Sequence, residues 1–168
     1  MFDVPLADLP ILWTGLKLGV ALLFALPIAW DRERNTRIVG LRTLPLVAVG
    51  SCAYVLVAQT FLTIEDTGAN ARIMQGLLSG IGFLGGGAIL KNKDHVMGTA
   101  SAASIWILGA MGAAVAYGRY DLAFLLALID FAVLHVLGRL KRHVPTRDEN
   151  GPSEEPDEPG EPDEPDER

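Results

Sequence analysis

Two charged side chains and one histidine interrupt the apolar stretches of this 168-residue sequence: Lys17, Asp130 and His135. Lys17 lies eight residues after Leu9, and Asp130 lies eight residues after Leu122, where two of these stretches begin. In a stretch that crosses a membrane, an isolated charge near mid-bilayer costs about 2.5–3.5 kcal/mol, so charges there are expected to pair. The sequence therefore predicts a Lys17–Asp130 ion pair, with His135 about one turn deeper. The alternatives are a proton or cation pathway through Asp130 and His135, or a Lys17 ammonium that reaches the lipid surface.

Two other patterns resemble chemical sites but lack the necessary context. Gly80, Gly82 and Gly85 match the dinucleotide-binding fingerprint, yet that fingerprint needs a preceding strand and an acidic residue about 20 positions later. Asp94 and His95 are only two adjacent metal-ligand types, so we expect a surface loop there. The sequence predicts no catalytic residue, metal site or cofactor, and therefore a protein that is not an enzyme.

The apolar residues are grouped into five long stretches. A helix needs about 17–25 apolar residues to cross a bilayer, and these stretches are 17 to 22 residues long. We therefore predict an all-α integral membrane protein, a bundle of about five transmembrane helices in the lipid bilayer, rather than a soluble enzyme or a nucleic-acid binder. The predicted spans are Leu9–Trp30, Thr43–Ile64, Ile73–Leu90, Thr99–Gly118 and Leu122–Gly138.

The composition changes sharply near the end of the chain. Residues 148–168 include 11 acidic residues, one basic residue and five prolines, and none is hydrophobic. Such a segment has nothing to bury in a core. We predict a transmembrane domain over residues 1–143 and a disordered, Pro/Glu/Asp-rich cytoplasmic tail over residues 144–168.

Basic residues in the predicted connections indicate the orientation. Alternate connections hold 10 and 2 Lys or Arg residues, and the richer side is expected to face the cytoplasm. This places the N-terminus outside and the C-terminus inside a bacterial inner membrane, in a multi-pass arrangement. Met1–Pro10 contains no Lys or Arg, so the first span is expected to remain as a helix rather than to be removed as a signal peptide.

Small residues recur along the third predicted span. At 100° per residue they occupy an arc of about 120°, and the set is Gly76, Ser79, Gly80, Gly86 and Gly87. Gly82 and Gly86 form a further small-xxx-small pair, a spacing that lets membrane helices approach closely. We predict that this span packs tightly on the fourth, with Ala102, Ala103 and Trp106 in the packing surface; an oligomer seam is the alternative.

A charged motif follows the first span. It comprises Asp31, Arg32, Glu33 and Arg34, then Gly40, Leu41, Arg42 and Thr43. We predict that Arg42 pairs with Asp31 or Glu33 and fixes a docking surface for a partner. The alternative is that these charges set the topology and contact lipid headgroups.

Three motifs together resemble a known family. The segments Arg32–Arg34 with Gly40–Thr43, Gly76–Gly87 and Ser101–Trp106 look like the MgtC/SapB family of bacterial inner-membrane proteins, in the same order and spacing from about residue 11 to residue 140. The resemblance implies a non-enzymatic protein linked to adaptation to low magnesium and to acid stress, including survival of pathogens in the host. It also implies a regulator that acts on other membrane proteins, including the F-type ATP synthase.

We therefore expect a regulator that works through helix–helix contact with a partner. One rival is a transporter or channel for Mg²⁺ or another small solute, although a divalent ion favours carboxylate-rich sites and the spans hold essentially one acid. A structural scaffold built as a homo-oligomer is the other rival. The sequence predicts no nucleic-acid partner.

Overall fold

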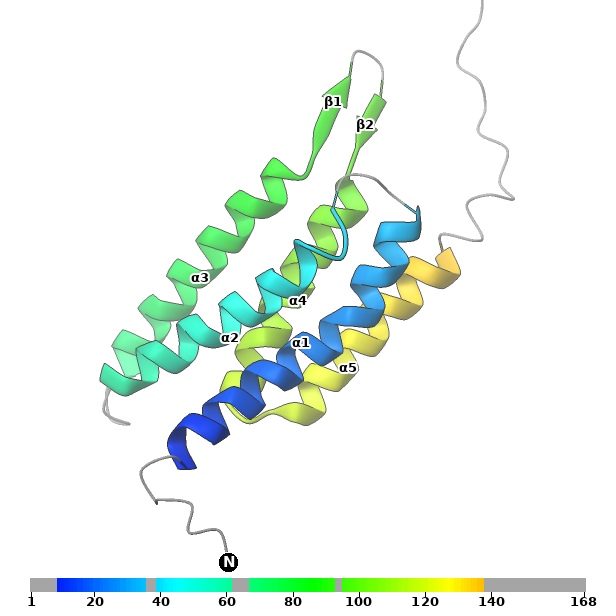
Figure 1. Cartoon of the computed structure of the whole chain (residues 1–168). Helices are drawn as coiled ribbons and strands as arrows, with labels where there is room; N and C mark the ends of the chain where they lie inside the picture. Colours follow the sequence, from blue (N-terminus) through cyan, green and yellow to red (C-terminus); the bar gives the residue numbers. More distant parts are fainter. Residues whose placement is uncertain (1–8, 36–38, 62–66, 93–94, 138–168) are drawn as a thin grey trace, which may run out of the picture.

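The described part of the chain forms a bundle of five helices (Figure 1). The computed structural model describes residues 9–35, 39–61, 67–92 and 95–137. Helices α1, α3 and α5 run in one direction and α2 and α4 in the other, so the predicted helical bundle is confirmed over these ranges. The predicted acidic tail lies outside the described residues. The helices are α1 (Leu9–Asn35), α2 (Leu44–Phe61), α3 (Thr67–Gly87), α4 (Thr99–Ala116) and α5 (Tyr120–Ala132), which continues into the π-helical turn η2 (Val133–Leu137).

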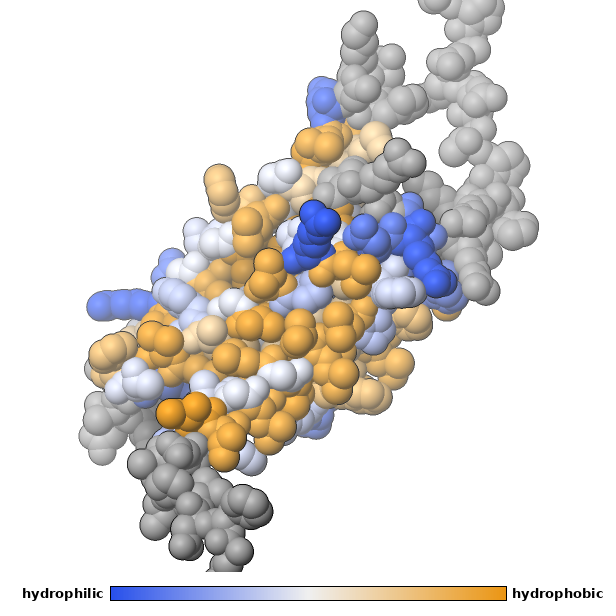
Figure 2. Space-filling view, viewed as in Figure 1, coloured by the Kyte–Doolittle hydropathy of each residue, from blue (hydrophilic) through white to orange (hydrophobic). Residues whose placement is uncertain are grey.

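Three of the described helices are long and apolar enough to cross a membrane: Pro10–Asn35 within α1, all of α2 and all of α4. Helix α3 begins with the polar segment Thr67–Arg72, and the α-helical part of α5 is 13 residues long. That α3 and α5 also cross the membrane therefore remains a prediction. Apolar side chains cover much of the bundle surface, as lipid contact requires (Figure 2).

A short hairpin joins α3 to α4, where the sequence predicted a plain loop. Strands β1 (Leu90–Asn92) and β2 (His95–Met97) pair antiparallel. Gly98 then starts α4 with a φ of +87°, and a Cβ there would overlap the carbonyl oxygen of Ala88. Only glycine fits this tight turn. Asp94 lies outside the described residues.

Helix α4 is the centre of the bundle and contacts the other four helices. Its Leu108, Met111 and Val115 are fully buried. Helix α2 crosses it closely at Gly112, where a Cβ would overlap the carbonyl oxygen of Ala48. Helices α1 and α5 lie side by side (Figure 1). The core is therefore built around α4, and α3 packs mainly on α4 at the edge of the bundle.

Candidate functional site

Helix α3 packs on α4, but not through the face that the sequence predicted. The Ile81 side chain lies over Gly109, where a Cβ would overlap it. Gly85 faces α4 at Ala102, whose carbonyl oxygen would lie 3.4 Å from an added Cβ, and Ala88 is also buried. The larger Ile81, rather than the glycine arc, thus fills the gap between the helices. The prediction of contact is confirmed, and the predicted contact face is wrong.

The glycine arc of α3 instead faces outward. We call Gly76, Ser79, Gly80, Gly86 and Gly87 the α3 small-residue face; all five are exposed. A Cβ added at Gly80, Gly86 or Gly87 would meet nothing within 4 Å, and the same holds at Gly82. Packing within the described part of the chain therefore does not require glycine at these positions.

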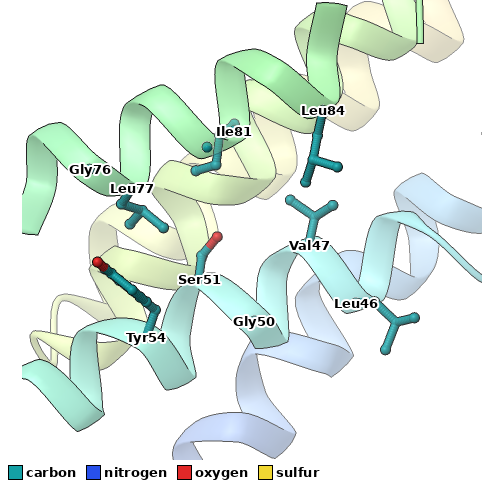
Figure 3. A pocket seen from close by; sticks show the side chains of 10 residues that line it. Leu46, Val47, Gly50, Ser51, Tyr54, Gly76, Leu77, Ile81 and Leu84 are labelled. Atoms are coloured by element: carbon teal, nitrogen blue, oxygen red, sulfur yellow. The ribbon is translucent and has the colours of Figure 1, made fainter. Parts of the chain in front are cut away.

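An apolar groove of about 330 Å³ adjoins this face, between α2 and α3 (Figure 3). Tyr54 and Ser51 line it from α2, and Gly76, Leu77 and Leu84 line it from α3. The groove exists because Gly76 and Gly80 have no side chains to fill it; a Cβ at Gly76 would lie 3.6 Å from the Tyr54 hydroxyl oxygen.

The predicted packing residues of α4 are divided between two environments. Ala102 is partly buried beside α3, whereas Ala103 and Trp106 are exposed, the latter by 56%. Three positions separate Ala103 from Trp106, so both project from the same side of the helix. The structure therefore places them on the bundle surface and not in the α3–α4 contact.

The charged motif after the first span makes specific contacts, but not the predicted ones. The Leu41 backbone N–H donates to Oε2 of Glu33 at 2.9 Å. The Asp31 carboxylate contacts Nδ1 of His135 at 3.1 Å. Arg42 is exposed, and among the described residues no ion pair joins it to Asp31 or Glu33, so its predicted pairing is wrong. The Arg34 guanidinium instead stacks over Trp30, 5.0 Å from the ring centroid.

The two intramembrane charges also have different partners from those predicted. The Lys17 ammonium donates to the carbonyl oxygen of Ala116 at 2.8 Å, at the C-terminal end of α4. Asp130 accepts a hydrogen bond from the Ser104 hydroxyl at 3.0 Å. The predicted Lys17–Asp130 ion pair is therefore wrong.

The register of α1 against α5 explains this error. The contact between Asp31 and His135 fixes an offset of 104 residues, whereas a Lys17–Asp130 pair needs an offset of 113. At 1.5 Å per residue, nine residues correspond to about 13 Å. The prediction aligned the N-terminal ends of the two spans, but α1 continues to Asn35, and its C-terminal part lies beside His135.

Two features of this charged region were missed in the sequence. The hydrogen bond from Ser104 to Asp130 was not predicted, because nothing in the spacing of Ser104 connects it to a residue on another helix. The π-helical turn η2 was also missed; Val133–Leu137 is apolar apart from His135 and carries no Gly or Pro to mark a change of helix type.

Comparison with known proteins identifies the family. The sequence model of the MgtC family matches residues 18–143. Protein SrpB of Synechococcus elongatus is 34% identical over 143 residues, which cover 77% of this chain and 79% of SrpB. YhiD of Escherichia coli K12 is 28% identical over 130 residues, 74% of this chain and 60% of YhiD. Protein MgtC of Salmonella typhimurium is 34% identical over 114 residues, 68% of this chain and 48% of that protein.

The extent of these matches differs between relatives. The chain spans most of SrpB but only about half of the Salmonella protein. No solved structure matches the chain. The family match nevertheless covers the described helices from within α1 to the end of η2. The chain is a member of the MgtC family of membrane proteins.

Proposed function

We propose that the chain is a non-enzymatic regulator in a bacterial inner membrane, and that it acts by binding another membrane protein through the α3 small-residue face. In lipid, helices associate by close packing, and small residues allow their backbones to approach. The α3 small-residue face offers such a surface on the outside of the bundle. The adjoining groove beside Tyr54 gives space for larger side chains of the partner helix.

One observation carries this proposal: α3 holds four glycines that its own bundle does not use. These are Gly80, Gly82, Gly86 and Gly87, each with open space where a Cβ would be. Glycine inside a helix costs roughly 0.5–1 kcal/mol relative to alanine. Four such positions within two turns cost several times that amount, so a requirement outside the bundle is the simplest reason for them.

Helix α1 provides a useful comparison. Gly15 and Gly19 are also exposed and also have open space at the Cβ position. They form a single small-xxx-small pair among large residues such as Leu16 and Leu18, and neither of them lines the groove beside Tyr54. The two helices therefore differ in the density of small residues, which makes α1 the natural control surface.

Membership of the MgtC family supports a role in adaptation to stress. The name of one relative mentions magnesium: YhiD is provisionally named a magnesium transporter. We propose that this chain takes part in adaptation to low magnesium or acid stress. We further propose the membrane sector of the F-type ATP synthase as its partner, as the MgtC/SapB resemblance implies.

Transport of Mg²⁺ or another small solute is the second candidate. The name of YhiD favours it, as do the buried charged residues Asp31, Arg32 and Asp130. Reconstitution separates the two functions, because a transporter moves its solute in liposomes that contain no other protein. Loss of solute flux in Asp130→Asn, with flux present in the wild type, would favour transport.

Site-specific photocrosslinking tests the regulator proposal. A photoreactive amino acid is placed at Ser79 or Gly86 on α3, and at Gly15 on α1 as the matched exposed control. We expect adducts with a membrane subunit of the F-type ATP synthase from both α3 positions and none from Gly15. Adducts with a second copy of the chain would favour a homo-oligomeric scaffold, and equal adducts from Gly15 would contradict specific docking on α3.

A further inference from the structure

A second group of residues, separate from α3, lies between α1, α4 and α5. We call Asp31, Arg32, Asp130 and His135 the inner charge cluster. Asp31, Arg32 and Asp130 are 8%, 7% and 2% exposed, which is unusual for charged residues unless they are paired. The guanidinium of Arg32 interacts electrostatically with Asp130 and with Asp31. Asp31 also contacts the His135 ring.

The charges of this cluster do not balance without an added proton. Among the described residues the cluster holds two carboxylates and one guanidinium, so these residues carry one net negative charge when His135 is neutral. Helix α4 supplies only hydroxyls, because Thr99–Ala116 holds no charged residue, and Lys17 is bound at the far end of α4. An uncompensated charge that is buried in protein is expensive. A single proton makes the cluster neutral, and only Asp130, Asp31 and His135 are able to hold it.

The geometry around Ser104 suits two protonation states of Asp130. The Ser104 oxygen lies 3.0 Å from Oδ1 of Asp130 and 3.1 Å from the carbonyl oxygen of Ala100. A hydroxyl has one hydrogen and therefore donates to one of them at a time. When Asp130 is ionised, Ser104 donates to it. When Asp130 is protonated, its O–H donates to Ser104, and Ser104 donates to Ala100.

The environment of the other carboxylate oxygen of Asp130 also suits a protonated acid. Oδ2 of Asp130 is buried and has no hydrogen-bond partner among the described residues. A neutral carbonyl oxygen tolerates such a position better than a carboxylate oxygen does, because desolvating a charge costs more than desolvating a dipole. The site is thus compatible with a neutral acid as well as with an anion.

His135 is positioned to exchange the proton with the surroundings. Its side chain is 38% exposed, against 10% for that of Asp31. In an α-helix, residues five apart differ by 140° around the axis, whereas the i→i+5 geometry of a π-turn brings them towards one side. The turn η2 therefore brings His135 closer to the side of Asp130 than an α-helical turn would. The His135 ring stacks on Phe131, with 5.4 Å between centroids.

We propose that the inner charge cluster is a binding site for one exchangeable proton, held either by His135 or by Asp130. With the proton on His135, the imidazolium pairs with Asp31, and Arg32 neutralises the Asp130 carboxylate. With the proton on Asp130, Arg32 neutralises Asp31, and Ser104 turns its hydrogen to Ala100. The proton comes from water at His135, and no other atom is transferred. This site requires no partner protein, so it stands independently of docking on α3.

Infrared spectroscopy of the purified full-length chain in lipid nanodiscs tests this site at pH 7. Exposed carboxyl groups are ionised at that pH, so a carboxylic-acid C=O band reports a buried acid. In His135→Gln the imidazole is absent, so the proton can bind only to the buried acid. We therefore expect this band to be stronger than in the wild type. We expect its loss in His135→Gln/Asp130→Asn. Absence of the band in His135→Gln would overturn the proposal, as would its survival in the double variant.

Two serine variants keep the test decisive if the double variant does not fold. In the His135→Gln background, Ser104→Ala removes the group that accepts the Asp130 proton, so the band should move to higher wavenumber. Ser104→Thr should restore its position. Ser101→Ala is the matched control, since Ser101 is equally buried on α4 but its hydroxyl has no hydrogen-bond partner among the described residues. A band that Ser104→Ala leaves in place would contradict the assignment to Asp130.

Discussion

The carboxylate of Glu33, in the last turn of α1, accepts a hydrogen bond from the backbone N–H of Leu41 at 2.9 Å. It thereby fixes the turn that leads into α2, in which the Gly40 carbonyl oxygen accepts from the N–H groups of Thr43 and Leu44. A Cβ at Gly40 would overlap the same carboxylate and lie 3.2 Å from the Glu33 Cα. Glu33 and Gly40 therefore belong to one structural unit that orients α2 against α1.

Substitutions in this unit should lower stability. Gly40→Ala forces Glu33 away from Leu41, and we expect a loss of about 1–3 kcal/mol, as for overpacked sites. Glu33→Ala should cost about 1 kcal/mol by removing the acceptor, and Glu33→Gln should retain most of the stability. Reversible unfolding in mixed detergent and SDS micelles, followed by circular dichroism, measures each change. An unchanged midpoint for Gly40→Ala would contradict this arrangement.

Lys17 should act on the end of α4 and not on Asp130. Lys17→Met leaves the Ala116 carbonyl without its cation, and we expect a loss of about 1 kcal/mol, since cations stabilise helix C-termini. Lys17→Arg should retain the interaction. The exchange Lys17→Asp with Asp130→Lys should not restore the amount of folded protein in membranes. Full recovery in that double variant would show that the two residues do pair.

The contact between Ile81 and Gly109 should appear as energetic coupling. Gly109→Ala forces its methyl group into Ile81, and we expect a loss of about 1–3 kcal/mol. Ile81→Ala makes room for that methyl group, so the double variant should be more stable than the sum of the single effects by about 0.5–3 kcal/mol. Unfolding midpoints of the four proteins give this value. Simple additivity would mean that α3 does not contact α4 at this point.

Two classes of glycine should respond in opposite ways to alanine. Gly112→Ala should destabilise the bundle, because the new Cβ would overlap the backbone of α2 at Ala48. Gly80→Ala and Gly87→Ala should leave stability unchanged or raise it by up to about 1 kcal/mol, since alanine is the better helix former. The same detergent–SDS titration distinguishes these results. Destabilisation by Gly80→Ala would indicate that the chain itself requires this glycine.

The helices could be predicted from the sequence because each apolar stretch of about 17–25 residues is long enough to form one membrane helix. The start of α4 at Thr99 agrees with the prediction, and the start of α2 differs by one residue. The end of α1 was missed by five residues: Asp31–Asn35 is polar, which ends an apolar span but does not end a helix. The hairpin of β1 and β2 was missed because backbone pairing between three-residue segments leaves almost no pattern in the side chains.

Features of the site could be predicted only where they depend on the residue spacing within a single helix. The glycine arc of α3 follows from helical spacing alone, and the structure shows these residues on one exposed surface. Which partner each charge selects depends on the register between helices. Lys17 and Asp130 therefore received wrong partners, because a shift of nine residues along α1 changes every neighbour on α5.

Docking through α3 is tested most directly by ATP-driven proton pumping in inverted membrane vesicles. The vesicles come from a deletion strain that is complemented with the wild type, Gly86→Leu on α3 or Gly15→Leu on α1, at equal amounts of the chain and of ATP synthase. Both substitutions add a side chain where the bundle has open space. We expect the wild type and Gly15→Leu to reduce pumping and Gly86→Leu to leave it at the level of the deletion strain. Equal reduction by all three proteins, or by none, would contradict regulation through the α3 small-residue face.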